Sequence, residues 1–81
     1  MLYLIDKPLA DIAFRTAARD DDAQLVLIQD GVLLDPNLDV PTYAVDRDVA
    51  VRGVDLPARI EPIAYADLVE LLFSHEVKSF V

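Results

Sequence analysis

The sequence predicts an α/β domain built on a mostly parallel sheet of four or five strands. Short apolar runs alternate along the chain with segments whose apolar residues recur at helical spacing. This alternation is typical of α/β domains, in which right-handed crossovers join parallel strands. The run Leu25–Ile28 is entirely aliphatic. Both of its faces therefore require burial, as in an internal strand of a parallel sheet.

The first part of the chain predicts a strand followed by a helix. Leu2–Ile5 is a short apolar run, and Pro8 after it is tolerated in the first turn of a helix. Helical spacing continues from there, which predicts a helix that ends near Arg19. Beyond that point Asp20–Asp22 would place three negative charges at the negative end of the helix dipole. The residues at helical spacing are Leu9, Ile12, Ala13 and Ala17.

The central strand is predicted at Gln24–Gln29, where Asp30 and Gly31 end the apolar run. Gly31 predicts a bend that other residues would resist. The segment 30–40 contains Pro36 and leaves room for only one or two helical turns, at Val32–Leu34.

The second half predicts two further strands, each followed by a helix. Pro41–Val45 is the third strand, and Asp46 is placed to cap a short helix that Gly53 ends. Ile60–Ala64 is the fourth strand, where Pro62 favours an edge position. The helix Tyr65–Val77 carries apolar residues around more than half of its circumference, which predicts deeper burial than in an ordinary surface helix. The last residues, 78–81, are expected to form a short terminal strand.

Composition predicts a single domain that acts as a subunit. Hydrophobic residues make up 54% of the 81 residues, above the roughly 45–50% of ordinary globular chains. A chain of this length hides only about 60% of its unfolded surface. The apolar surplus therefore favours burial of a further face against another chain.

Charge and cysteine content exclude several classes of function. The formal net charge is −8, and the seven cations are scattered, which disfavours direct binding of nucleic acid or an anionic membrane. The chain has no cysteine, so it can form neither a disulfide nor a thiolate nucleophile. No apolar run is long enough to span a bilayer, and the first residues lack the basic start of a signal peptide. We expect a cytoplasmic protein.

Few residues suggest chemistry on their own. His75 is the single histidine and has no partner at metal-ligand spacing, so a structural role is favoured. Asp30 and Gly31 stand where a parallel sheet places ligands or partners, although Asp-Gly also ends strands without any function. Tyr43, Arg52 and Tyr65 suit either an interface or the sealing of a core edge.

Three blocks of the sequence resemble the TusB/DsrH family. They are Leu25–Val32, Tyr43–Gly53, and Ile63–Val69 together with His75. The resemblance implies a three-layer α/β/α fold of the DsrE/F/H type and a place in sulfur relay. It implies TusC/DsrF-like and TusD/DsrE-like partner subunits, in which a cysteine of the TusD/DsrE-like chain passes persulfide sulfur to a TusE/DsrC-like acceptor. In the Tus system that sulfur ends in the 2-thiouridine of tRNA wobble positions.

Together these observations predict a non-catalytic subunit with no cofactor and no metal, because persulfide carriage needs a thiolate. The expected signature and interface positions are Gln29, Asp30, Gly31, Val32, Tyr43, Arg52 and Tyr65. Val32 and Leu33 are expected to be exposed. One alternative is a stand-alone homo-oligomer that holds a small ligand at the Asp30-Gly31 edge. Another is an acid/base enzyme that uses Asp30 or Asp48 with His75.

Overall fold

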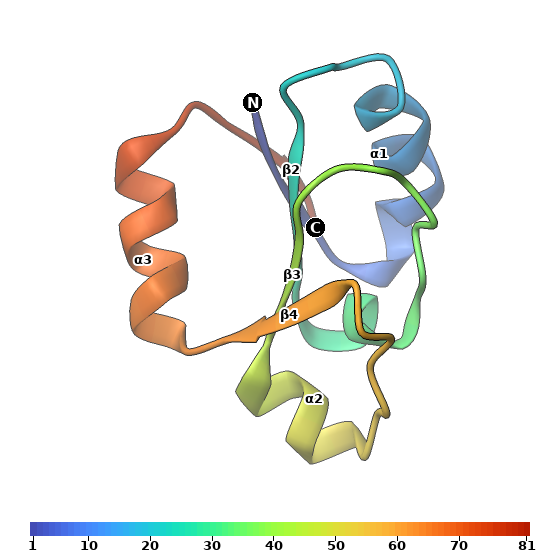
Figure 1. Ribbon diagram of the computed structural model, residues 1–81, viewed down its shortest axis with the longest axis vertical. Coiled ribbons are helices and arrows are strands. Elements are labelled where there is room, and N and C mark those ends of the chain that lie inside the picture. The colour runs from blue at the N-terminus through green and yellow to red at the C-terminus, as the bar shows by residue number, and fades with distance from the viewer.

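Five strands form one sheet in the computed structural model, which describes residues 1–81. The sheet order is β4-β3-β2-β1-β5, and every neighbouring pair is parallel. Three α-helices and two short 3₁₀ helices connect the strands, so the predicted α/β/α class is confirmed (Figure 1). The strands are β1 (Leu2–Ile5), β2 (Gln24–Leu27), β3 (Thr42–Val45), β4 (Ile60–Ile63) and β5 (Val77–Phe80). The helices are η1 (Lys7–Leu9), α1 (Ala10–Ala17), η2 (Gln29–Leu33), α2 (Asp46–Arg52) and α3 (Tyr65–Ser74).

The strand order explains why α1 and α3 lie on opposite faces of the sheet. From β1 to β4 the chain steps from strand to neighbouring strand in one direction. It then returns through α3 from the β4 edge to β5 at the far edge. A crossover in the reverse direction is right-handed only on the other face. Figure 1 shows α3 on the side of the sheet opposite α1.

The central strand is buried on both faces, as the aliphatic run predicts. Leu25, Val26 and Leu27 of β2 are fully buried. Leu25 and Leu27 belong to the core on the α1 face, and Val26 belongs to the core on the α3 face. This division follows the two-residue period of a strand.

The core on the α1 face is the larger of the two. Small side chains allow α1 to pack close to the sheet, since Ala10, Ala13 and Ala17 are all buried. These alanines meet Tyr3 and Ile5 of β1 and the side chains of β2 on that face. The core there contains 11 buried residues, against five on the α3 face.

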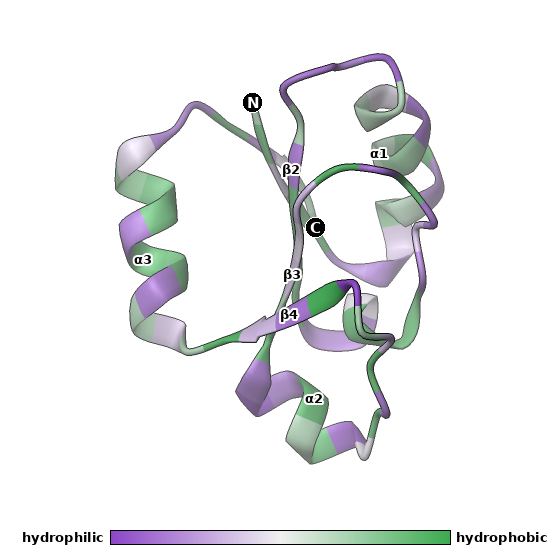
Figure 2. Cartoon of the chain, in the orientation of Figure 1, coloured by the Kyte–Doolittle hydropathy of each residue, from purple (hydrophilic) through white to green (hydrophobic).

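The prediction of a deeply buried last helix is wrong. Leu68 is the one fully buried residue of α3, and Leu71 and Leu72 are half-buried. The sheet covers one side of α3, and no other element lies on its outer side (Figure 1). Apolar residues nevertheless occur along most of α3, as Figure 2 shows. Part of the apolar surface of this helix therefore faces outward.

The element boundaries differ from the prediction by a few residues. Asp46 is the first residue of α2 rather than its cap, and Val45 occupies the cap position without a side-chain hydrogen bond. The last helix ends at Ser74, because His75 has an extended backbone. Gly53 ends α2 in the left-handed region with φ of 63°, and Pro62 lies in the edge strand β4, both as predicted. None of the helices has the length and apolar character that crossing a membrane requires.

Candidate functional site

The loop after β2 is held in place by the first turn of α2. Gln29 has a positive φ of 50°, which is uncommon for a residue other than glycine. Its backbone N–H donates a hydrogen bond to Oδ2 of Asp48 over 2.8 Å. The carboxylate of Asp48 thus stabilises a backbone conformation that the loop would otherwise adopt at a cost.

Arg52 joins the same loop to the end of α2. Its Nε donates to Oδ1 of Asp30 over 2.8 Å, and its Nη1 lies 3.5 Å from Oδ1 of Asp48. The pairs Gln29–Asp48 and Asp30–Arg52 therefore bridge two separate parts of the chain. Three of the predicted positions, Gln29, Asp30 and Arg52, are brought together in this network.

Two of the predicted positions lie inside the molecule instead of on its surface. Val32 is only 1% exposed, so the prediction that it is exposed is wrong. It packs in the core on the α1 face, because η2 turns its side chain toward the sheet. Gly31 is also buried, and the positive φ lies at Gln29 rather than at the glycine. Leu33 is 51% exposed, as predicted.

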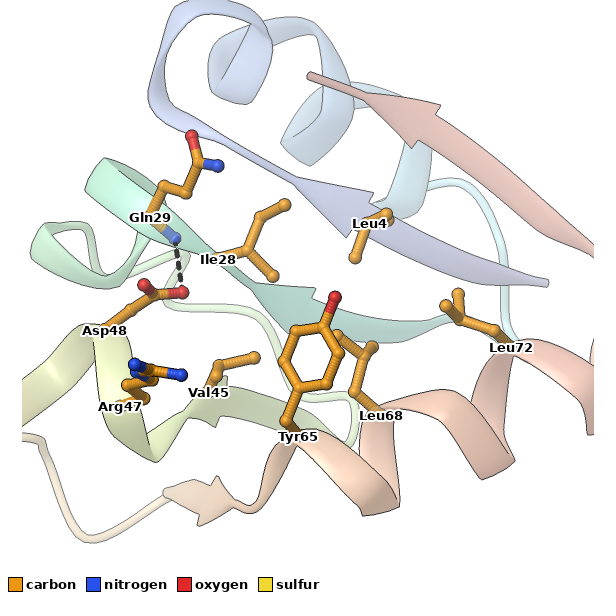
Figure 3. A pocket seen from close by; sticks show the side chains of 9 residues that line it. All are labelled: Leu4, Ile28, Gln29, Val45, Arg47, Asp48, Tyr65, Leu68 and Leu72. Carbon is orange, nitrogen blue, oxygen red and sulfur yellow. Dashed lines mark hydrogen bonds between the residues drawn. The ribbon is translucent and has the colours of Figure 1, made fainter.

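A cavity of about 250 Å³ opens beside this network, between α3 and the carboxyl ends of β2 and β3. Figure 3 shows its residues on both sides of the hollow. The apolar wall consists of Leu4, Ile28, Val45, Leu68 and Leu72. The polar rim consists of Gln29, Arg47, Asp48 and Tyr65. A larger hollow of about 600 Å³ lies at the end of α1, but residues from that one helix end alone line it, and no apolar wall closes it.

Tyr65 and Tyr43 lie at different places. Tyr65 lines the cavity with Gln29, while its side chain remains 66% exposed. Tyr43 is half-buried on β3 and lines a separate hollow on the other flank of α3. The predicted positions therefore do not form one continuous surface.

His75 is held far from the acids of the loop. A backbone carbonyl can only accept, so Nδ1–H of His75 donates to the oxygen of Leu71 over 3.0 Å. The Gln24 side-chain amide then donates to Nε2 of His75 over 3.1 Å. Gln24 begins β2, whereas Asp30 and Asp48 lie beyond its other end, which is roughly 10 Å away along this four-residue strand. The acid/base pairing of His75 with Asp30 or Asp48 is not present in this arrangement.

Arg47 and the apolar wall of the cavity were not among the predicted site positions. One local signal marks Arg47, because the first turn of a helix favours acids and disfavours cations. Arg47 is the second residue of α2 and lies between Asp46 and Asp48. A cation in this place suggests a role other than helix stability.

The two ionisable groups with shifted pKa values lie outside this site. Burial raises the pKa of Tyr3, and its hydrogen bond to Asp20 and the charge of that carboxylate add to the effect. The hydrogen bond from Arg59 lowers the pKa of Asp35, and the backbone N–H of Asn37 adds to this effect. No group of three or more His, Asp or Glu side chains lies close enough together to hold a metal ion.

The comparisons with known proteins identify the fold and no more. No protein-family model matches this chain, and no curated protein matches it. Among solved structures the chain is similar to the solution NMR structure of protein Tm0979 from Thermotoga maritima, with a TM-score of 0.66 and 23% sequence identity. The match covers 94% of this chain and 95% of that chain. The chain therefore shares a small α/β fold with that protein along nearly the whole length of both.

Proposed function

We propose that this chain is a non-catalytic subunit of a sulfur-relay complex of the TusBCD/DsrEFH type. Such a complex serves 2-thiolation of tRNA wobble uridine or sulfur oxidation. The chain has no cysteine, so a persulfide must be carried by a partner. The role of this chain is to complete the assembly that holds that partner.

The sequence blocks that resemble TusB/DsrH form one region of the molecule, which supports the proposal. The first block contributes Gln29 and Asp30, and the second contributes their partners Asp48 and Arg52. The third block contributes Tyr65, which lines the same cavity as Gln29. Contacts between the blocks give a structural reason for these residues to occur together.

The observation that carries the proposal is an exposed apolar stripe along one flank of α3, which runs from Tyr65 at the rim of the cavity to the strongly exposed Phe73. We define the α3 stripe as Tyr65, Val69 and Phe73, which follow one another at four-residue spacing and so share one side of the helix. These residues are 66%, 37% and 86% exposed, respectively. Burying a phenylalanine of this kind contributes about 1.5–3 kcal/mol. Exposed apolar stripes of this type are typical of protein interfaces, which supports the proposal.

Charge indicates what kind of surface the α3 stripe meets. Asp67 and Glu70 are exposed on the same helix, and the chain has a net charge of −8. A second copy of this chain would bring like charges together, whereas a partner with a basic rim around an apolar groove would not. We therefore favour a different, related subunit over a homodimer.

The test is native mass spectrometry of the tagged protein purified from the cells that make it. We expect it to co-purify with two related small α/β chains, one of which bears a persulfidated cysteine. Phe73→Asp should abolish this association, because it places a charge at the most exposed residue of the α3 stripe. The matched control is Val51→Asp, since Val51 is 76% exposed on α2 and lies outside the α3 stripe.

The possible outcomes test the sulfur-relay role and the position of the partner interface separately. A wild-type protein whose native mass is that of a lone homo-oligomer would contradict the sulfur-relay role. A folded Phe73→Asp protein whose complex keeps its native mass would show that the partner binds elsewhere. Circular dichroism of each variant checks that the fold is retained.

A further inference from the structure

We propose that the cavity beside Gln29 is a binding site for a small amphipathic carboxylate, with Arg47 at its rim as the recognition group. This inference does not depend on the sulfur-relay role, because it concerns the isolated chain. It rests on an apolar wall, on a cation that has no partner, and on a hydroxyl at the rim.

The wall of the cavity is apolar and is built from three elements and the residue that follows β2. Leu4 comes from β1, Val45 from β3, and Leu68 and Leu72 from α3, while Ile28 directly follows β2. Val45 and Leu68 are buried, and the other three are half-buried. Pockets for small ligands have such a wall, with few polar groups that fix orientation.

Arg47 is the charged residue of the rim that forms no ion pair. None of the ion pairs in the structure involves Arg47. Asp48, the acid beside it, is already compensated by the backbone N–H of Gln29 and by Arg52. A guanidinium recognises a carboxylate through two parallel hydrogen bonds. The rim therefore offers an unmatched cation, which selects for a carboxylate.

Tyr65 adds a second polar group to the rim. Figure 3 shows its ring standing between α3 and the strands, with its hydroxyl directed over the hollow. The side chain of Gln29 points away from the cavity in the same view, so the amide takes no part. The Tyr65 hydroxyl can donate to the bound carboxylate, and its ring covers the apolar body of the ligand.

The size of the cavity limits the ligand to a small molecule. A volume of about 250 Å³ lies just below the roughly 300–1,000 Å³ that is typical of ligand pockets. The space therefore suits a compact aromatic or branched aliphatic acid better than a nucleotide or a lipid. Phenylacetate has a suitable apolar body and a single carboxylate, and it serves as the probe.

The experiment is a titration of the ¹⁵N-labelled chain with three probes, followed by NMR. Phenylacetate combines charge and apolar body, phenylacetamide keeps the shape without the charge, and acetate keeps the charge without the body. We expect phenylacetate to bind at least tenfold more tightly than either of the others. Its shift changes should concentrate on the backbone amides of Ile28, Gln29, Arg47 and Tyr65.

Two variants test the role of Arg47. Arg47→Gln should weaken phenylacetate binding about tenfold and leave phenylacetamide binding unchanged. Arg19→Gln is the matched control, because Arg19 is an exposed cation without an ion pair just beyond α1, on the other face of the sheet. It changes the net charge by the same amount and should bind phenylacetate as the wild type does.

Several results would overturn the proposal. One is equal affinity for phenylacetate and phenylacetamide. Another is an equal loss of affinity in the Arg47 and Arg19 variants, which would reduce the effect to net charge. Shift changes away from the cavity, or no binding of phenylacetate up to its solubility limit, would also reject the site. None of these results bears on the sulfur-relay complex, which is tested separately through Phe73.

Discussion

Gly31 allows the loop after β2 to pass directly over the end of β1. A Cβ atom at this position would lie 2.4 Å from the backbone oxygen of Ile5 and 3.3 Å from Cα of Asp6. Both neighbours are backbone atoms, so they cannot move aside as a flexible side chain would. The glycine is required by this close approach, because its φ does not lie in the left-handed region. Gly53 is required for the opposite reason, since its φ is 63° and nothing lies within 4 Å of its Cβ position.

These two reasons predict different responses to substitution. Gly31→Ala should destabilise the protein by about 1–3 kcal/mol through overpacking. Gly53→Ala should cost about 1–2 kcal/mol through backbone strain. Asparagine tolerates the left-handed region, so Gly53→Asn should recover part of its loss, whereas Gly31→Asn should recover none. Urea denaturation of the four variants measures these differences. Recovery by Gly31→Asn would show that backbone conformation, and not the contact with Ile5, selects the glycine.

At the scale of whole elements, the local sequence pattern predicts whether a segment is a helix or a strand better than it predicts how deeply that element is buried. The aliphatic run in β2 and the edge position of β4 follow from residues within one strand, and both predictions are confirmed. The burial of α3 depends on whether another layer covers its outer side, which no periodicity within the helix records. An apolar surface that is too wide for one contact predicts either a core helix or an exposed interface, and here the helix has one covered side.

The candidate site, like the burial of α3, depends on contacts between elements that a local sequence pattern does not record. Gln29, Asp30, Arg52 and Tyr65 are recognisable from sequence blocks, but their contacts join residues 19 or more positions apart. Local spacing cannot predict such pairings. The cavity wall is also assembled from several elements, so it becomes visible only when the elements are packed. The sequence does not predict the burial of Val32, because a rotation of one residue in η2 decides whether its side chain faces the core or the surface.

The attachment of η2 to α2 should depend more on Asp48 than on Asp30. Asp48 accepts from the Gln29 backbone and pairs with Arg52, whereas Asp30 makes a single ion pair with Arg52 and is more exposed. Exposed ion pairs contribute about 0–1 kcal/mol. The hydrogen bond from the Gln29 backbone is exposed to water, so its net contribution is about 0.5–1.5 kcal/mol. We expect Asp48→Ala to lower the free energy of unfolding by about 1 kcal/mol more than Asp30→Ala does.

Asp46→Ala is the control for this comparison. Asp46 lies in the same first turn of α2, so its loss removes a similar interaction with the helix dipole. It forms none of the hydrogen bonds or ion pairs described for the loop. Chemical denaturation gives the three free energies, and hydrogen exchange at the Gln29 amide reports the loop directly. If Asp48→Ala and Asp46→Ala lowered the free energy of unfolding equally, the helix dipole, rather than the loop contact, would account for the role of Asp48.

At the scale of the whole molecule, the dominant feature is unbalanced negative charge. Fifteen acids face seven cations, and four of those cations, Lys7, Arg19, Arg47 and Lys78, form no ion pair. The molecule measures 30 × 24 × 23 Å along its principal axes. At 0.01 M salt the Debye length is about 30 Å, so all of its charges interact, while at 0.1 M it is about 10 Å. Folding thus brings the negative charges close together, and salt can screen the repulsion between them.

We therefore expect the protein to become more stable as sodium chloride is raised from about 0.01 M to about 0.2 M. A gain of about 1 kcal/mol would raise Tm by about 4–8 °C in a chain of this size. The control variant carries Asp21→Lys and Glu76→Lys, two exposed positions whose side chains have no bonding partner. Each replacement adds two units of charge, which changes the net charge from −8 to −4. Its Tm should be higher than that of the wild type at low salt and should rise less on addition of salt. A wild-type Tm that stays constant or falls would mean that the ion pairs around Arg52 and Arg15 outweigh the repulsion, since salt weakens those pairs as well.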